Sequence, residues 1–416
     1  MKKSILSIFL MLLLSSCHQQ TKKIIEPAND DKIIKDSLTE VLMEIHKKGF
    51  INGFSVAIVT QDSTLYENGI GYADTENKIA YTKNTVQNIA SISKTLIGIA
   101  LLKAQEMGKL SLDDPIEKHL PFKVKNPYYP LEEITIKQLA THTSSIKDAN
   151  VYNEKSYVLN TKQDSTSGLL KEVSENFNPP ENKISIEDFL KNVLSEDGKW
   201  YTKESFLKKK PGALFEYSNV GATLAALVLE GATGESYHTF TSKHILQPLK
   251  MKSSGWSFDA IDLDLAQHSK LYATPEKEFP LYSLITYPDG GLITSSHDLG
   301  LYLTELIKGY SGNGTLLKKE SYHELFKKQM SPDQFTERDE ENPYNDEYDF
   351  GIFIGFSAKG YIGHTGGDPG VSSFMFFDAE KKIGRILIIN TDLNNKEGVD
   401  EFYAVWDTLG AYQERF

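Results

Sequence analysis

The chain has 416 residues, of which 40% are hydrophobic and 25% charged, and this composition is typical of a globular protein with a sizeable core. Its formal net charge is −12 and it has no basic stripe, so nucleic acid is not expected as a partner. Cys17 is the single cysteine, which excludes an intrachain disulfide and any thiol nucleophile or cysteine-based metal site elsewhere.

The N-terminus predicts an exported lipoprotein. "MKKSILSIFLMLLLSSC" has two lysines, an apolar stretch too short to span a bilayer and then small residues, which is the pattern of a secretory signal peptide over residues 1–17. "LSSC" resembles the bacterial lipobox, in which the cysteine, here Cys17, becomes the lipidated first residue. The alternative is a plain signal peptide with a chance cysteine. Residues 18–32 would form a polar tether, and residues 33–416 the folded domain.

The first part of the folded domain predicts a helix and two strands. The helix is expected over residues 32–48, where Ile, Leu, Val and Met are spaced along a polar segment. "GFSVAIVTQDSTLYENGIGYAD" then alternates like two strands around a polar turn. Further on, Thr135 is expected to cap a helix in "ITIKQLATHTSSI", and Ser296 to cap one in "SSHDLGLYLTELIKG".

Two segments of the middle region are polar. Residues 150–210 are rich in Lys, Asn and Ser; part of this segment either borders the active cleft and sets substrate size, or is a surface insertion. Residues 337–349, "ERDEENPYNDEYD", form an acidic run that predicts a solvated loop.

Period-two patterning returns near the C-terminus. "FGIFIGFS", "KGYIGHTGG", "SSFMFFDAE" and "GRILIINTD" predict four consecutive antiparallel strands, with a last helix over residues 395–416. We therefore expect an α+β fold: an antiparallel sheet flanked by helices and built from both chain ends, about 33–90 and 345–416, with a mostly helical inserted subdomain over about 91–344. A cleft is expected where the two parts meet.

Lys94 is out of place for a structural residue. It lies at the start of "IASISKTLIGIALL", an apolar segment that reads as a buried helix, where the positive end of the helix dipole disfavours a cation. Ser91 is three residues earlier, on the same helix face. Burial and the dipole favour the neutral amine, which can take a proton from a serine hydroxyl, and the free N–H groups of the first turn can stabilise an oxyanion. Alone, S-x-x-K is a weak signal, because it also occurs by chance.

Two further motifs accompany this pair. "YSN" places Tyr217 and Asn219 at the entry to an apolar helix, where both side chains can point into a cleft. "HTGG" places His364 on a predicted strand, where glycines permit a ligand to approach the backbone closely. Taken singly, Tyr217 could be a half-buried aromatic residue and His364 a surface strand residue.

S-x-x-K, Y-x-N and H-T-G in this order resemble the penicillin-recognising serine hydrolases, the family of class C β-lactamases, D-alanyl-D-alanine carboxypeptidases, D-aminopeptidases and related esterases. Further segments carry the same resemblance over about residues 51–391, among them "GKLSLDDPIEKHLP", "PGALFEYSNVGATLAALVLEGATG", "PDGGLITSSHDLGLYL" and "GHTGGDPGVSSFMFFD". Residues 150–210 remain unmatched.

The resemblance implies roles for individual residues. Ser91 would carry the acyl-enzyme, and Lys94 would either accept its proton or tune the hydrogen-bond network. Tyr217 would pass a proton to the leaving group and share the role of base with Lys94. Asn219 would form hydrogen bonds with the substrate amide and with Lys94. Thr365, together with Gly366, would bind a substrate carboxylate or amide. His364 would replace the lysine of K-T-G. The oxyanion hole would consist of the backbone N–H groups of Ser91 and Gly367. No metal or organic cofactor is implied.

Some residues depart from the family pattern or are set aside. H-T-G in place of K-T-G resembles the carboxypeptidase and aminopeptidase branches more than a dedicated class C β-lactamase. A histidine that can be neutral at pH 7 anchors a carboxylate less firmly than lysine. Ser145 stands where the family usually has glycine. His119, His142 and His244 are expected to be structural or surface residues, and the residues around Ser357 match the nucleophile elbow only superficially.

Three functions remain open from the sequence. The first is an exported serine hydrolase that acts on a D-amino-acid peptide, an ester or a β-lactam. The second is a penicillin-binding protein or sensor that is acylated without efficient turnover. The third is a catalytically silent surface lipoprotein. All three place the protein in the periplasm or at the outer membrane or cell surface, with a lipid anchor at Cys17 and a small-molecule or peptide ligand.

Overall fold

The computed structural model describes residues 28–161, 177–258, 268–336 and 338–416. The predicted signal peptide, Cys17 and most of the predicted tether lie outside these residues. Within the described part of the chain, no helix is long and apolar enough to cross a membrane.

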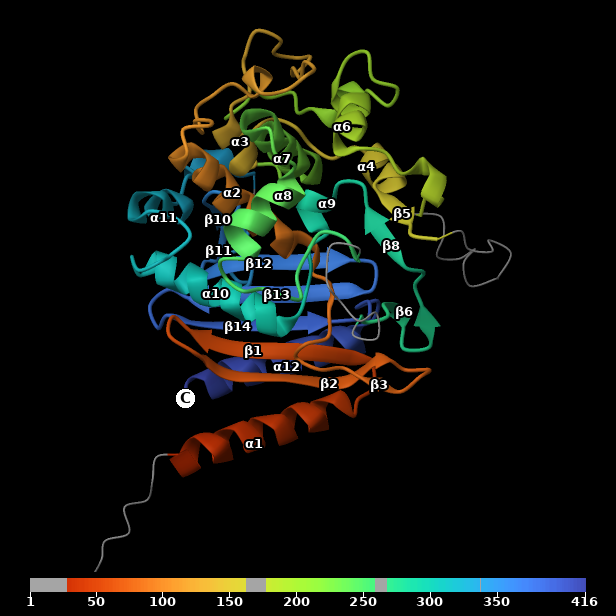
Figure 1. The fold of residues 1–416 in the computed structure, drawn as a ribbon, viewed down its shortest axis with the longest axis vertical. Helices are drawn as coiled ribbons and strands as arrows, with labels where there is room; N and C mark the ends of the chain where they lie inside the picture. Colours follow the sequence, from red (N-terminus) through yellow and green to blue (C-terminus); the bar gives the residue numbers. More distant parts are fainter. Residues whose placement is uncertain (1–27, 162–176, 259–267, 337) are drawn as a thin grey trace, which may run out of the picture.

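An eight-stranded antiparallel sheet forms the centre of the fold, in the order β10-β11-β12-β13-β14-β1-β2-β3. Figure 1 shows how the strands from the N-terminal part, in orange, continue the sheet of the C-terminal strands, in blue. The junction is the β1–β14 pair, in which Ala57 lies opposite Ile386. The expected sheet from both chain ends is therefore confirmed. The strand bounds are Gly53–Thr60 (β1), Thr64–Asp74 (β2), Ile79–Ala80 (β3), Asp349–Phe350 (β10), Gly355–Phe356 (β11), Tyr361–Asp368 (β12), Val371–Asp378 (β13) and Ile383–Ile389 (β14).

One predicted strand is interrupted. "FGIFIGFS" forms the short β10 and β11 instead of one continuous strand. The Gly351 N–H donates to the Ile354 carbonyl at 2.8 Å, and Phe353 has a φ of +51°, so the chain turns between them. A left-handed φ is incompatible with an extended strand, and the alternation of apolar residues does not reveal it.

Helices cover both faces of the sheet (Figure 1). On one face, α1 (Ala28–His46) and α12 (Lys396–Gln413) enclose a core that includes Leu42, Phe54 and Trp406. On the other face, α10 (Ser296–Tyr310) packs against β1 and β14.

The N-cap of α10 is Ser295, whose hydroxyl accepts from the Asp298 N–H at 3.2 Å. The prediction of Ser296 was one residue late, because Ser295 and Ser296 are adjacent at the start of the helix and the sequence does not distinguish them as caps. The Thr135 cap is confirmed, since Thr135 and Gln138 form a capping box.

The helical subdomain is built around α2 (Lys94–Glu106) and α7 (Asn219–Thr233), which pack together in the largest core. Almost every residue of α2 is buried, as its apolar sequence predicts. The shorter elements include η1 (Ala90–Ser93), α3 (Ile136–Ala140), α4 (Asn150–Lys155), α6 (Ile186–Leu194), α8 (Tyr237–Thr241), α9 (Tyr287–Gly290), α11 (Lys319–Leu325) and the strand pairs β4 (Gln87–Asn88) with β9 (Ile293–Thr294), β5 (Tyr157–Leu159) with β8 (Tyr282–Leu284), and β6 (Tyr272–Thr274) with β7 (Lys277–Glu278).

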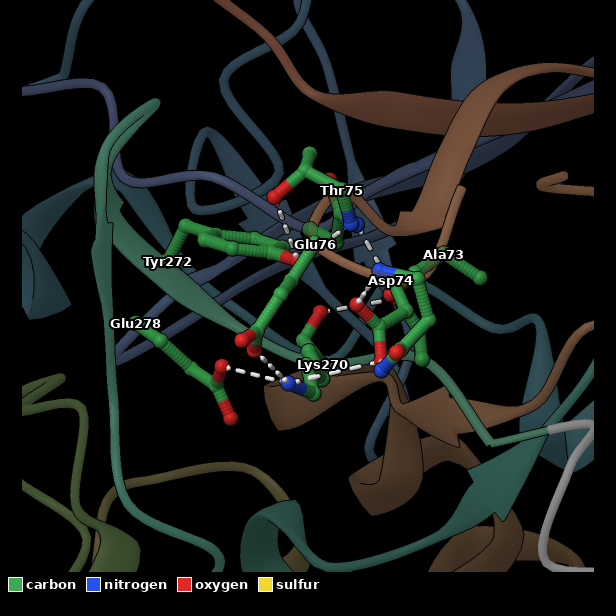
Figure 2. Close-up of polar contacts among 10 residues, drawn as sticks. Ala73, Asp74, Thr75, Glu76, Lys270, Tyr272 and Glu278 are labelled. Carbon is green, nitrogen blue, oxygen red and sulfur yellow. Dashed lines mark hydrogen bonds and ion pairs between the residues drawn. The ribbon is translucent and has the colours of Figure 1, made fainter. Parts of the chain in front are cut away.

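The β6–β7 hairpin is attached to the end of β2 by Lys270 (Figure 2). Its Nζ lies 2.9 Å from a Glu278 carboxyl oxygen, 3.3 Å from Asp74 and 3.5 Å from Glu76. Partial burial by itself would lower the pKa of Lys270, but the surrounding carboxylates raise it. The Tyr272 hydroxyl accepts from the backbone N–H of Thr75 at 3.0 Å, so polar contacts fix the hairpin from two sides.

Candidate active site

Ser91 and Lys94 lie at the start of α2. Ser91 belongs to the 3-10 turn η1, and Lys94 is the first residue of the helix. The Lys94 Nζ lies 2.8 Å from the Ser91 Oγ and donates to the backbone carbonyl of Asp289 at 2.7 Å. Ala90, just before Ser91, has a φ of +49°, which bends the chain sharply into the turn.

The Lys94 side chain is completely buried. Burial lowers the pKa of Lys94, although the carboxylates of Asp289, Asp148, Asp368 and Asp346 oppose this effect. The neutral amine form of Lys94 is therefore more populated at neutral pH than that of an ordinary lysine. The amine lies within hydrogen-bonding distance of the serine hydroxyl.

Tyr217 completes this cluster from the other side. The Lys94 Nζ is 5.1 Å from the centroid of the Tyr217 ring. Burial raises the pKa of Tyr217 well above its ordinary value, while a hydrogen bond with Ser91 acts in the opposite direction. The Tyr217 and His364 ring centroids are 6.0 Å apart, so the structure brings all four expected catalytic side chains into one cluster.

Asp148 holds the loop that carries Tyr217 and Asn219. Its carboxylate accepts from the Ser218 hydroxyl at 2.9 Å and from the backbone N–H groups of Asn219 and Val220, both at 3.0 Å. The Asn219 side-chain amide also donates to Asp148, at 2.8 Å. Within the described residues, no hydrogen bond joins Asn219 to Lys94, whose Nζ instead contacts the Ser91 Oγ and the Asp289 carbonyl.

Asp346 organises the H-T-G motif on β12. The Thr365 backbone N–H donates to the Asp346 Oδ2 at 2.7 Å, and the Thr365 hydroxyl donates to it at 3.1 Å. The His364 Nδ1 lies 2.6 Å from the Thr365 carbonyl and 3.2 Å from the Asp346 Oδ2. Both neighbours are acceptors, so Nδ1 carries the proton. Nε2 has no hydrogen-bond partner in the described chain. Burial lowers the pKa of His364 more than Asp346 raises it, which favours the neutral ring.

The two glycines after Thr365 have different surroundings. A Cβ at Gly366 would lie 2.4 Å from the Ile89 carbonyl oxygen and 2.4 Å from the Ser373 Oγ, so only glycine lets β12 approach the Ser91 turn this closely. A Cβ at Gly367 would meet nothing within 4 Å. The end of β12 therefore lies open beside the turn that carries the serine.

The family comparison agrees with this geometry. The Beta-lactamase family model matches residues 36–410. The chain belongs to the Beta-lactamase family. The family expected from the sequence motifs is thus confirmed, and with it a serine hydrolase fold.

Curated relatives match this family member over part of their length. Protein flp of Staphylococcus aureus (strain MW2) is 29% identical over 260 residues, which are 61% of this chain and 45% of that protein. The human mitochondrial serine beta-lactamase-like protein LACTB is 30% identical over 243 residues, 50% of this chain and 44% of that protein. The matches therefore span less than half the length of these relatives.

Solved structures share the fold. An octameric penicillin-binding protein homologue from Pyrococcus abyssi superposes with a TM-score of 0.68 at 23% identity, covering 91% of this chain and 77% of that chain. The D-amino acid amidase from Ochrobactrum anthropi SV3, complexed with L-phenylalanine, has a TM-score of 0.64 at 19% identity and covers 91% of this chain and 99% of that chain.

In this Beta-lactamase family member, His142 lies beside the candidate site. Its ring stacks on Tyr217 with centroids 4.5 Å apart and planes at 28°, and its Nδ1 accepts from the Ser218 N–H at 3.1 Å. Burial lowers the pKa of His142 well below its ordinary value. The expectation of a structural histidine fits these contacts, but its position next to Tyr217 was not foreseen.

Ser145 has a φ of +67°, in the left-handed region that favours glycine. This backbone angle explains why the sequence pattern of the family usually has glycine at this position.

The other residues set aside lie in ordinary surroundings. His119 pairs with Asp114 at 3.0 Å, and His244 lies against the ring of Phe240. The Ser357 hydroxyl accepts from the Tyr361 N–H at 3.1 Å in the turn before β12. Within the described ranges, no group of three or more His, Cys, Asp or Glu residues is arranged to hold a metal ion.

Part of the 150–210 segment borders the site. The Tyr152 hydroxyl contacts both carboxyl oxygens of Asp289 at 3.2 Å, and the Tyr157 hydroxyl donates to Asp368 at 2.6 Å. Tyr157 and Gly367 line one cavity of about 650 Å³. Of the two alternatives for this segment, its described part therefore fits the one in which it adjoins the cleft.

Sequence reasoning missed the carboxylates of this site. Asp346 is only 6% exposed, so the predicted solvated loop is wrong at this residue. Its role depends on a contact with β12, 19 residues further along the chain, and the acidic run gave no signal of it. For Asp148, the only signal was indirect. The serine before the apolar α7 indicates a helix start, where the first backbone N–H groups need hydrogen-bond acceptors such as a carboxylate.

Proposed function

We propose that the protein is an exported serine hydrolase that forms an acyl-enzyme on Ser91 and hydrolyses an amide or ester. The observation that carries the proposal is the fully buried Lys94, whose Nζ lies 2.8 Å from the Ser91 Oγ and whose pKa is lowered by burial. Among the described residues, no carboxylate forms a hydrogen bond with the Lys94 amine. Burying such an amine is costly for stability, and a proton-accepting role next to a nucleophile accounts for it.

In the proposed mechanism, neutral Lys94 removes the proton from the Ser91 hydroxyl as Oγ attacks the substrate carbonyl carbon. The backbone N–H groups of Ser91 and Gly367 stabilise the resulting oxyanion. Tyr217 donates its proton to the leaving nitrogen or oxygen, that bond breaks, and Lys94 reprotonates Tyr217. A water molecule then attacks the acyl carbon, loses its proton to the same base pair, and releases the acid and the Ser91 hydroxyl.

The substrate-binding roles of Asn219, Thr365 and Gly366 are proposed from their positions beside Ser91 and along β12. Asn219 would contact the substrate amide, and Thr365 with Gly366 would line the site along β12. His364 in place of a lysine favours a peptidase or esterase over a β-lactamase. The D-amino acid amidase among the structural neighbours is compatible with amide substrates.

Export and anchoring are proposed from the N-terminal sequence. Cleavage before Cys17 and lipidation of its thiol would hold the domain at a membrane surface on a tether of residues 18–32. Radiolabelled palmitate incorporation that is lost in Cys17→Ala tests this anchor. Incorporation that persists in the variant would contradict it.

The activity is tested by labelling the purified protein with a fluorophosphonate and with a fluorescent penicillin. Ser91→Ala should abolish labelling, and Ser357→Ala is the matched control that should retain it. Labelling that survives in Ser91→Ala would overturn the nucleophile assignment. A chromogenic cephalosporin then distinguishes turnover from acylation alone.

A further inference from the structure

A polar cavity of about 590 Å³ opens on the Tyr217 side of the site. Its walls include Glu216 and Tyr217 from the loop before α7, and Arg338, Asp339 and Glu347 from the segment before β10. Tyr217 is the proton donor to the leaving atom in the proposed mechanism. A substituent on the leaving group would therefore extend along the wall that Tyr217 shares with Glu216.

The charges of this cavity are unbalanced. Three carboxyl side chains line it, but only one cation, Arg338. The Arg338 guanidinium lies 4.1 Å from the centre of the Phe335 ring, so it is placed against an aromatic face. The Glu216 and Glu347 carboxyls form no hydrogen bond or ion pair with any residue that the structure describes. Burial raises the pKa of both groups. Lys147 opposes this effect at Glu216, and at Glu347 the neighbouring Asp346 adds to it while Lys94 opposes it.

The groups expected to hold a substrate carboxylate point elsewhere. Thr365 donates its hydroxyl and its backbone N–H to Asp346. His364 uses its one proton, on Nδ1, between Asp346 and the Thr365 carbonyl. What His364 has left is the lone pair of Nε2, which is buried and has no partner in the described chain. The donors at this edge that could bind an anion are therefore already engaged within the protein.

We propose that the leaving group of the substrate carries a primary ammonium, which is bound on the Tyr217 side by Glu216 and Glu347. This inference rests on the proposed function, because it uses Tyr217 to assign the leaving-group side. An ammonium supplies a counter-charge and three hydrogen-bond donors to these carboxyl groups, whereas a carboxylate would be repelled by those that are ionised.

Three aryl acetates with the same acyl group test the inference. Para-aminomethylphenyl acetate carries the ammonium, para-ethylphenyl acetate is its neutral isostere, and para-carboxymethylphenyl acetate is the anion. Because the acyl-enzyme is identical, kcat/KM differences report the leaving-group side. We expect the cationic ester to exceed the neutral one by about tenfold and the anionic ester to be the slowest, as one or two carboxylates across a partly solvated cavity imply.

Glu216→Gln and Glu347→Gln should each lower the cationic-to-neutral ratio by about threefold or more. Glu380→Gln, an exposed carboxylate in the β13–β14 turn, is the matched control and should leave the ratio unchanged. A ratio near one in the unmodified protein, or a ratio insensitive to both variants, would overturn the inference.

Ser91→Ala separates the two proposals. If Ser91→Ala abolishes hydrolysis of all three esters and the unmodified protein hydrolyses them without a charge preference, the proposed hydrolase stands and the ammonium site is contradicted. If hydrolysis survives in Ser91→Ala, the proposed function falls. Protection of Ser91 from fluorophosphonate by para-aminomethylphenol, compared with para-ethylphenol, gives a readout that does not depend on ester turnover. Stronger protection by the amine supports the site, and equal protection contradicts it.

Discussion

Replacing Asp148 with alanine should loosen the loop that carries Tyr217. The Asp148 carboxylate accepts hydrogen bonds from the Ser218 hydroxyl, two backbone N–H groups at the start of α7 and the Asn219 amide. Hydrogen bonds to a charged group contribute about 1.5–3 kcal/mol each, and a carboxylate at a helix N-terminus adds about 0.3–1 kcal/mol through the dipole. The site is partly open, so water can replace some of these contacts.

We therefore expect Asp148→Ala to lower the free energy of unfolding by about 2–4 kcal/mol, near the upper range for loss of a helix cap and its attached network. For a large domain this corresponds to a decrease in melting temperature of about 4–10 °C. Labelling of Ser91 by fluorophosphonate should slow by about tenfold or more at a temperature where the variant is folded, because the Tyr217 loop loses its anchor.

Thermal unfolding followed by circular dichroism and the labelling rate are the two measurements. Asp62→Ala is the matched control, since Asp62 is an exposed carboxylate in the β1–β2 turn. A melting temperature within 1 °C of the parent corresponds to a change of only about a few tenths of a kcal/mol. If Asp148→Ala melts within this limit and its Ser91 is labelled at the parent rate, the reasoning that Asp148 couples α7 to the site is refuted.

Three further predictions follow from the same contacts. Lys94→Met should abolish Ser91 labelling yet match or exceed the parent in stability at neutral pH, because it removes a buried amine; thermal unfolding of the two proteins measures this. The pKa of Lys94 is lower in the folded protein than in the unfolded chain, so at pH values between the two the unfolded chain binds more protons. In this pH range the free energy of unfolding of the parent should therefore rise with pH relative to that of Lys94→Met. A difference between the two proteins that is independent of pH would contradict the lowered pKa. Gly366→Ala should destabilise the fold by about 2 kcal/mol or more, since its Cβ would meet the Ile89 carbonyl, whereas Gly367→Ala should melt like the parent; equal melting of both variants would contradict the close approach of β12 to the Ser91 turn.

Local patterns in the sequence predict most of the architecture. The short apolar segments of β1, β13 and β14 and the long apolar run of α2 each identify one element correctly, because these segments are buried almost along their whole length. The β10–β11 region fails this test, since its turn depends on a single left-handed residue, Phe353. Apolar patterning reports which side chains are buried and not the backbone angles between them.

The motifs locate Ser91, Lys94, Tyr217 and His364, but not the groups that hold them. The Asp148 carboxylate reaches Ser218 across 70 residues of sequence, and the Asp289 backbone carbonyl accepts from Lys94 across 195. Such contacts arise only when the sheet and the helical subdomain are assembled. A short motif cannot encode them, so the supporting carboxylates became visible only in the structure.

The anchor of the β6–β7 hairpin has a built-in redundancy. Because Lys270 has three carboxylate partners, loss of any one of them leaves two, and the hairpin base tolerates mutation on the acidic side. Loss of the lysine is not equivalent, since it leaves three like charges facing one another. Ala273 and Phe279, on this hairpin, line the cavity next to Gly367. The hairpin can therefore diversify in evolution, and with it one wall of the cleft, as long as a cation remains at its base.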